Sequence, residues 1–327
     1  MSFTVAVETE IFGSIQSRYL FTATQVTVTS GLHPCSRGRN VSRIRGNTQV
    51  HVSFHGVRGS TPCPGPDTAR YGGNTSCVVL RVDKDQPLIL DLGTGLRTFG
   101  NSHRSSFENS GTPLHARALL THLHWDHVMG LPFFSPMLNP GATLDVYGPV
   151  QEDGTSFDTA MREMIKPPMF PVHLSDFPGE FRFHSIGEGE LDLGDFHVTA
   201  RLIPHIGETL GYRIRHNDLV VAYLPDVQQP VDGSHVVDEA ILELAADADL
   251  LIHDSQYTPD EFSQRANWGH CTADFAITTA QKCGVKSLAL FHHDPSRTDH
   301  DLDHSPYVTH DHGLQVYVAR EGMTLSL

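Results

Sequence analysis

THLHWDH, residues 121–127, places three imidazoles and one carboxylate within six positions of this 327-residue chain. His122 and His124 are two residues apart, so both rings can face one point if the loop is extended. Asp126 and His127 follow at once, where the chain turns toward a helix, and they can address a second point nearby. Imidazole and carboxylate ligands suit borderline divalent metals without any thiolate. The segment therefore predicts a metal site rather than a polar loop with exposed histidines.

Short apolar runs surround this segment and predict strands. Each run has four to eight residues, is rich in Val, Ile, Leu or Tyr, and is bounded by Gly, Pro, Asp or Asn. The runs lie at 50–54, 76–82, 87–93, 116–122, 144–148, 196–203, 210–215, 219–224, 249–254 and 287–293. Helical candidates are fewer and lie around 155–166, 235–247 and 272–283. Many strands with a few helices between them predict stacked sheets flanked by helices, an α/β architecture.

Composition limits the classes of function. The chain carries 23 Lys and Arg against 38 Asp and Glu, a formal charge of −15, and it also has 22 histidines. We expect no long nucleic-acid partner, because phosphate-backbone binding needs clustered Lys and Arg. No run approaches the roughly 20 apolar residues of a membrane span, so no membrane partner is expected. Five cysteines without a CxxC pair, and no visible secretory signal, predict a reducing, cytoplasmic location.

The first 48 residues differ in charge from the rest. They contain five Arg against two Glu, whereas the remainder has a formal charge of −18. We interpret 1–48 as an N-terminal extension of unknown role and 49–327 as the folded domain. The tail at 300–312 is rich in His and Asp, and its role is left open.

The sequence HLHWDH after a strand resembles the HxHxDH signature of the metallo-β-lactamase fold. The resemblance extends in the right order over residues 50–327. DLGTG at 91–95 is similar to the family's strand-ending Asp and Gly-rich turn under the metal loop. The resemblance implies that 49–327 is a hydrolase domain with the αββα four-layer sandwich, in which helices flank two mixed β-sheets.

The resemblance also implies further metal ligands. His205 in LIPHIGETLGYRI matches the family's third histidine, Asp226 in AYLPDV its bridging carboxylate, and His292 in LALFHHDP its last histidine. By analogy, one ion would be held by His122, His124 and His205, and the other by Asp126, His127 and His292, with Asp226 between them. His293 is the rival for the role of His292.

Two divalent ions about 3.5–4 Å apart can share a carboxylate and a hydroxide, which then becomes a nucleophile near neutral pH. We expect Asp126 to orient that hydroxide as well as to bind an ion. Zinc suits the His and carboxylate ligands, and manganese and iron remain alternatives.

NWGHCTADFAITTAQKCGV, residues 267–285, resembles the GHST segment of the family's phosphodiesterase branch, which includes tRNA 3′-end processing enzymes and the phosphonate-pathway cyclic phosphodiesterase. The branch histidine contacts the scissile phosphate, so the resemblance implies a catalytic role for His270. Asp254 in LIHDSQ would take the place of its acidic partner. A histidine held by a carboxylate stays cationic near neutral pH and can protonate a leaving oxygen. The alternative is that His270 only caps the following helix beside Thr272.

The tRNA-processing relatives insert a long arm between the third histidine and the bridging Asp. Here His205 and Asp226 are 21 residues apart and two predicted strands fill the span, so we expect no arm. The segment GVRGSTPCPGPDTARYGGNTSC, residues 56–77, resembles the loop that closes over the site in small-substrate relatives. It offers Arg58, Asn74 and Thr75 as candidate substrate contacts, although loops rich in Gly and Pro also occur for structural reasons alone.

These features predict a dinuclear metal-dependent phosphodiesterase that hydrolyses small, mainly cyclic phosphodiesters by attack of a metal-bound hydroxide. The alternative is an ester, thioester or lactone hydrolase of the same fold. A third reading is a non-catalytic protein that sequesters a nucleotide. Asp rather than Cys at the bridging position 226 argues against the β-lactamases that use a thiolate ligand. A homodimer is left open.

Overall fold

The computed structural model describes residues 49–82, 86–307 and 313–327, with residues 103–110 described by their backbone only. The predicted extension 1–48 lies outside the described residues, as does the part of the tail at 308–312. All described residues belong to one compact unit. None of the helices in these ranges combines the length and the apolar character that crossing a bilayer requires.

The strands and helices follow one another as in the predicted pattern, with several additions. The strands are β1 (Val50–Gly56), β2 (Cys77–Val82), β3 (Leu88–Leu90), β4 (His115–Leu119), β5 (Thr143–Pro149), β6 (Glu180–Ile186), β7 (Gly189–Leu193), β8 (Phe196–Leu202), β9 (Leu210–His216), β10 (Leu219–Leu224), β11 (Leu250–Asp254), β12 (Ser287–Phe291), β13 (Gln315–Val318) and β14 (Thr324–Ser326). The helices are α1 (Gly95–Ser110), α2 (Trp125–Val128), α3 (Phe157–Met164), α4 (Glu239–Ala245), α5 (Pro259–Arg265), α6 (Ala273–Lys282) and α7 (Asp299–Asp303).

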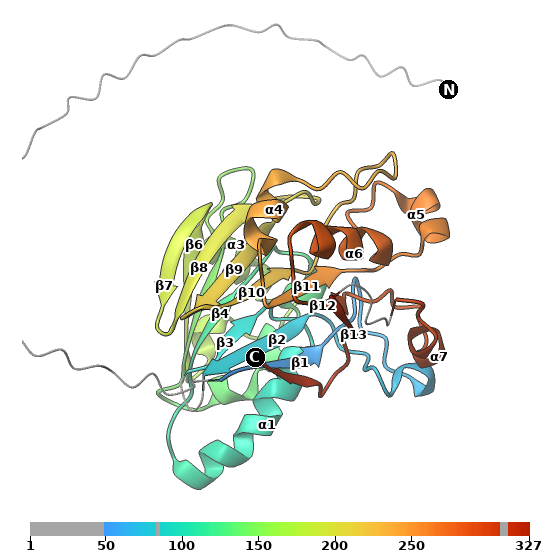
Figure 1. The fold of residues 1–327 in the computed structure, drawn as a ribbon. Coiled ribbons are helices and arrows are strands. Elements are labelled where there is room, and N and C mark those ends of the chain that lie inside the picture. The colour runs from blue at the N-terminus through green and yellow to red at the C-terminus, as the bar shows by residue number, and fades with distance from the viewer. Residues whose placement is uncertain (1–48, 83–85, 308–312) are drawn as a thin grey trace, which may run out of the picture. The chain divides into compact units, whose positions relative to one another are not determined.

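Two seven-stranded mixed sheets pack against each other, and helices cover their outer faces (Figure 1). The strand order is β14-β1-β2-β3-β4-β5-β6 in the first sheet and β13-β12-β11-β10-β9-β8-β7 in the second. Helices α1 and α3 pack on the first sheet, and α4 and α6 on the second. The predicted αββα sandwich of two mixed sheets is confirmed.

Side chains that alternate between the two faces of each strand produce the separate hydrophobic cores. In β2, Val78 and Leu80 enter the core between the two sheets, whereas Cys77 and Val79 enter the core under α1 and α3. Successive side chains of a strand point to opposite faces, so one strand supplies two cores. A third core lies between the second sheet and α4 and α6, where Phe275 is buried. Burial of a side chain such as Leu or Phe contributes about 1.5–3 kcal/mol.

The ten predicted strands correspond to β1–β5 and β8–β12, and the three predicted helices to α3, α4 and α6. Helix α1 was not predicted, because its sequence GLRTFGNSHRSSFENS is rich in Gly, Ser and Asn and shows no sustained apolar period. Strand β6 was missed because only Phe181 in it is buried. The loops that follow β4, β8, β10 and β12 meet at one edge of the sandwich, and these loops carry the predicted ligands.

Candidate metal centre

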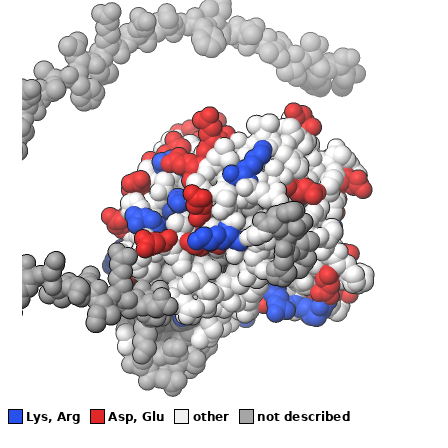
Figure 2. Space-filling model, in the orientation of Figure 1, with Lys and Arg blue, Asp and Glu red and all other residues white. Residues whose placement is uncertain are grey.

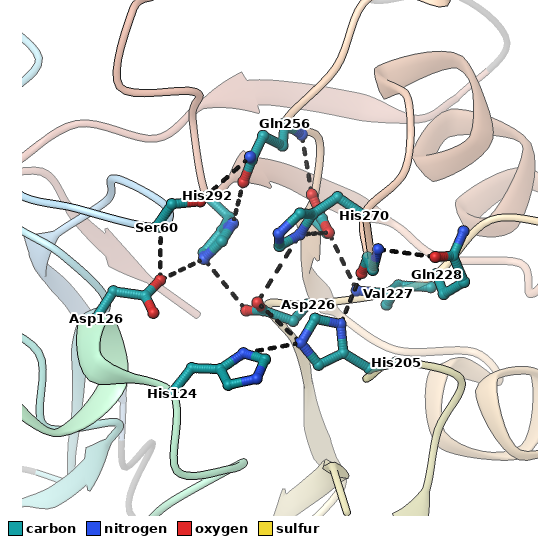
Figure 3. A network of polar contacts seen from close by, with 12 residues as sticks. Ser60, His124, Asp126, His205, Asp226, Val227, Gln228, Gln256, His270 and His292 are labelled. Carbon is teal, nitrogen blue, oxygen red and sulfur yellow. Dashed lines mark hydrogen bonds and ion pairs between the residues drawn. The ribbon is translucent and has the colours of Figure 1, made fainter. Parts of the chain in front are cut away.

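The seven predicted metal ligands lie together in two groups. Within each group the potential ligand atoms are within 4.8 Å of one another, and the groups are His122, His124, His205 and Asp226, and Asp126, His127 and His292. Oδ2 of Asp226 lies 3.8 Å from His122 Nε2 and 3.7 Å from His205 Nε2. Its Oδ1 lies 3.1 Å from His127 Nε2 and 3.3 Å from His292 Nε2. One carboxylate thus faces both groups, as Figure 3 shows for His205 and His292.

The backbone around α2 separates the ligands of the motif. His124 is the N-cap of α2 and is extended, with φ −63° and ψ 149°. His122 therefore lies with His124 on the strand side, while Asp126 and His127 belong to the first turn of the helix. This change from strand to helix sends neighbouring residues to two different points.

Hydrogen bonds to Nδ1 atoms orient several of the rings. His127 Nδ1 donates to Asp91 Oδ2 at 2.7 Å, and Asp91 is itself fixed by the Thr121 backbone N–H at 2.8 Å. His205 Nδ1 donates to the Gly269 carbonyl at 2.7 Å. His292 Nδ1 donates to Gln256 Oε1 at 2.9 Å (Figure 3). In each case Nε2 is left facing the cluster, which is how metal-binding imidazoles are commonly held.

Two buried polar atoms at the centre have no hydrogen-bond partner among the described residues: His127 Nε2 and Asp226 Oδ1. They lie 3.1 Å apart, but their alignment is not that of a hydrogen bond. Buried polar atoms without partners are rare and destabilising. A cation between them would satisfy both, so the residues fit the two divalent ions that the sequence predicts.

The protonation states of the histidines in the centre are also those expected of a site for divalent cations. Burial lowers the pKa of His122 well below its usual value and that of His205 to about 4, so both rings are neutral. Burial alone would lower the pKa of His127 too, but Asp226 and Asp126 raise it well above the usual value. The negative field that attracts a proton to His127 would attract a divalent ion in the same way.

Three non-glycine residues of the centre have left-handed backbones. Asp91 follows β3 with φ 58°, His292 follows β12 with φ 57°, and Ser60 has φ 61°. This conformation is unfavourable by about 1–2 kcal/mol for a residue with a Cβ. Asp91 and His292 are held in it by hydrogen bonds of their own side chains, to His127 and to Gln256. Strained residues of this kind concentrate at functional sites.

The predicted partner of His270 is in place. His270 Nδ1 donates to Asp254 Oδ2 at 2.9 Å. The same atom lies 3.8 Å from Asp226 Oδ2 (Figure 3). Burial by itself would lower the pKa of His270, but the charge and hydrogen bond of Asp254 raise it to about 9. Asp254 is fully buried and also accepts from the backbone N–H of Val227 and of Gln256. His270 is therefore held as a cation next to the bridging carboxylate.

Thr272 caps helix α6, and His270 does not. The Thr272 side chain accepts a hydrogen bond from the backbone N–H of Phe275. The alternative in which His270 is merely a helix cap is therefore wrong. His293 is separated from the centre in a similar way: its Nε2 donates to the Ala319 carbonyl, and burial lowers its pKa to about 3. Of the two neighbouring histidines, the structure brings only His292 to the cluster.

Arg58 and Thr75 are fully buried and have internal partners. Arg58 donates to the carbonyls of Gly72 and Arg297, and Thr75 Oγ1 accepts from the Thr94 backbone N–H. Neither side chain presents a surface to a substrate, so the structure corrects these two predicted contacts to roles in holding the loop.

Asn74 is only half-buried, but its side chain donates to Glu321 Oε2 at 2.9 Å. A substrate contact through Asn74 stays a prediction that this geometry does not favour.

Two residues of the centre had no signal in the sequence. The Ser60 backbone N–H donates to Asp126 Oδ2 at 2.7 Å, and Gln256 supports His292 while donating to Ser60 Oγ at 3.3 Å (Figure 3). A backbone donor carries no residue-type signature. Gln256 lies two residues after Asp254, but only its contact with His292 shows its role.

Comparison with known proteins matches residues 90–293 to the β-lactamase superfamily domain, a range that contains every predicted ligand and His270. A ribonuclease Z of Natronomonas pharaonis is 26% identical over 85% of this chain and 98% of that protein. The human tRNase Z short form superposes with a TM-score of 0.59 at 20% identity, covering 84% of this chain and 98% of that one. A diphosphatase from the PhnP family superposes with a TM-score of 0.57 at 18% identity, covering 85% and 98%. The two solved structures show the same fold as this chain.

Proposed function

We propose that this chain, which belongs to the β-lactamase superfamily, is a metal-dependent hydrolase of the phosphodiesterase branch. Its substrates would be small phosphodiesters, cyclic ones above all. The observation that carries this proposal is the pair of His270 and Asp254 beside Asp226. A phosphodiester is an anion whose leaving alkoxide needs a proton, and a cationic histidine supplies both charge and proton. A neutral carboxylic ester has less need of such a cation, which disfavours the alternative function.

The two groups of ligands would each hold one ion, with Asp226 shared between them. When bound, two such ions stabilise the charge of the reacting phosphate and activate a water for attack. Asp126 would orient that water, because the Ser60 N–H fixes its carboxylate at 2.7 Å. His270 would give its Nε2 proton to the departing oxygen, since its Nδ1 is committed to Asp254. Asp254 does not reach the substrate and acts as a positioning residue.

A small substrate is supported by the chain between His205 and Asp226. This span holds the β9–β10 hairpin, whose strands are joined by only two residues, so no arm extends from it. On the face drawn in Figure 2, acidic and basic side chains of the described residues are interspersed without a continuous basic band. The formal charge of −15 further disfavours a long polyanion. The name ribonuclease Z of a relative makes a precursor tRNA the substrate to compare against.

Zinc is the metal we propose, with manganese and iron as alternatives, because imidazole and carboxylate ligands suit it. We also propose a cytoplasmic location, since the four cysteines among the described residues are free thiols. Metal analysis of the purified protein tests the first point. The homodimer stays a prediction.

The reaction class can be tested with defined substrates. Protein loaded with zinc, and then with manganese, is assayed on bis(p-nitrophenyl) phosphate, p-nitrophenyl acetate, 2′,3′- and 3′,5′-cyclic nucleotides and a precursor tRNA. We expect the phosphodiesters to be cleaved in preference to the acetate, and the cyclic nucleotides in preference to the tRNA. Preferred hydrolysis of the acetate would favour the ester hydrolase, and efficient tRNA cleavage would reject the small-substrate proposal.

His270→Ala tests the catalytic histidine. We expect kcat for phosphodiesters to fall by a factor of roughly 10²–10⁴ while the metal content is unchanged. His184→Ala is a matched control, because His184 also pairs with a carboxylate, Asp145 at 2.9 Å, but away from the centre. Loss of metal from His270→Ala would show that His270 is a ligand rather than an acid.

A further inference from the structure

The chain contains two tryptophans, and both are exposed and close in the sequence to residues of the metal centre. Trp125 lies between His124 and Asp126 in the sequence and is 54% exposed. Trp268 lies two residues before His270 and is 59% exposed. Tryptophan is on average a highly buried residue, because its ring has the largest apolar surface of any side chain. Two exposed rings beside one centre are therefore unusual and point to a ligand that covers them.

The centre is closest to solvent at His124, the residue before Trp125. His122, His127, Asp226 and His292 are buried, and the side chain of His205 is only 1% exposed, whereas His124 is exposed. His205 Nε2 lies behind His124, 3.3 Å from its Nδ1, so His124 forms the open edge and His205 supports it. A substrate that reaches the ions must pass this edge.

Each tryptophan is linked through the backbone to one of these two histidines. Trp125 follows His124 directly, with Cα atoms about 3.8 Å apart. On the other side, the carbonyl of Gly269, the residue after Trp268, accepts from His205 Nδ1 at 2.7 Å. A Cβ placed on Gly269 would lie 2.7 Å from the His205 ring, which shows how closely this backbone packs on it.

Arg265 packs on the Trp268 ring. Its guanidinium carbon lies 5.5 Å from the centre of the Trp268 ring and 5.6 Å from that of Tyr257. A cation over an aromatic face restrains the ring. The same guanidinium pairs with Asp294 Oδ2 at 3.3 Å, so its charge is already partnered. His124 and His205 are thus each linked to an exposed tryptophan, next to a centre that would bind a phosphate.

We propose that the substrates are nucleoside phosphodiesters, and that the bases on the two sides of the scissile phosphate stack on Trp125 and Trp268. Nucleobases are flat and present a π-face whatever their sequence, so aromatic side chains bind them without base-specific hydrogen bonds. A dinucleotide, linear or cyclic, has one base for each ring. The inference rests on the proposed phosphodiesterase function and names the substrate class of that same site.

The kinetic test compares a substrate that has bases with one that has none. Hydrolysis of the dinucleotide ApA and of methyl p-nitrophenyl phosphate is measured for the wild type and for the Trp125→Ala and Trp268→Ala variants. We expect each variant to lower the ratio of kcat/KM for ApA over the methyl ester by about 10- to 100-fold, with most of the ratio restored in Trp125→Phe and Trp268→Phe. Leu242→Ala, an exposed apolar residue on α4, is the control.

An unchanged ratio in both alanine variants overturns the stacking inference, while hydrolysis of both substrates leaves the phosphodiesterase proposal standing. If neither substrate is hydrolysed, the proposed function fails and the binding measurement decides the inference by itself.

Binding is measured by fluorescence, because each Trp→Phe variant keeps a single tryptophan. We expect ApA to quench the emission of both single-tryptophan variants, with ribose 5-phosphate as the base-free control. Absence of quenching in both variants overturns the inference. A blue shift of the tryptophan emission with rising protein concentration, in the absence of nucleotide, would also overturn the inference. Such a shift would assign the rings to a contact between two copies of the chain.

Discussion

Asp226 serves two groups of ligands because its two oxygens point in different directions. Oδ2 faces His122 and His205, and Oδ1 faces His127 and His292. Without this carboxylate, Asp126 would be the one acidic residue left among the seven predicted ligands. Single residues of this kind are therefore sensitive to substitutions that preserve shape but remove charge.

His253 is a buried histidine outside the predicted ligands. It is fully buried in β11, its Nε2 has no hydrogen-bond partner among the described residues, and burial lowers its pKa. The unfolded chain therefore binds a proton at His253 below about pH 6.5 that the folded chain does not bind. This residue makes the folded state less stable as the pH falls from 6.5 toward its folded pKa.

We expect His253→Leu to reduce the acid sensitivity of folding. Between pH 6.5 and the folded pKa, the stability of the wild type should fall by up to about 1.4 kcal/mol per pH unit more than that of the variant. Urea unfolding of the metal-free proteins at pH 7.5, 6.5 and 5.5 measures the difference, with the exposed His115→Leu as control. A stability difference independent of pH would contradict this account.

The loop between β1 and β2 reaches the centre through its backbone, and Gly59 shows why it can approach so closely. A Cβ on Gly59 would lie 2.5 Å from Gln256 Oε1 and closer still to His292 Nδ1. The same loop supplies the Ser60 N–H to Asp126. The loop thus supports both the carboxylate and the last histidine of one ligand group.

We expect Gly59→Ala to lower the affinity for the ion held by Asp126, His127 and His292 about 10- to 100-fold. Changes in the residues that support a metal ligand have effects of that size. Zinc titration against a competing chelator measures the two affinities separately. Gly65→Ala is the control in the same loop, since its Cβ would have a nearest contact of 3.9 Å. Equal weakening in both variants would indicate a general disturbance of the loop.

For the chain as a whole, the centre joins the two sheets of the sandwich. The HLHWDH ligands follow β4 of the first sheet, whereas His205, Asp226 and His292 follow β8, β10 and β12 of the second. Bound ions would link the two sheets at this edge. Metal binding and folding should therefore be coupled.

We expect zinc to raise the midpoint of thermal unfolding. At 100 times the Kd, one ion adds about 2.7 kcal/mol of stability, which corresponds to about 5–10 °C for a domain of this size. Calorimetry with zinc and with chelator should show this shift in the wild type and in Asp145→Asn, but not in Asp226→Asn. A full shift in Asp226→Asn would contradict its bridging role.

Much of this protein could be deduced from the order of its amino acids. Short apolar runs bounded by turn residues locate ten strands, because both are properties of neighbouring residues. HLHWDH is recognisable because its ligands are adjacent in the sequence, whereas His205, Asp226 and His292 are found through the resemblance to the metallo-β-lactamase fold. Helix α1 was not predicted, because its polar, Gly-containing sequence has no regular apolar period and becomes helical through packing on the first sheet.

Tertiary structure alone decided the contacts between distant parts of the chain. It brought His292 rather than His293 to the cluster, gave His270 its partner Asp254 without making it a helix cap, and buried Arg58 in its own loop. These outcomes depend on strand register and on the turn after each strand, where a shift of one residue sends a side chain to the other face. Local sequence patterns determine where strands form, but the register between strands is set by the packing of the two sheets.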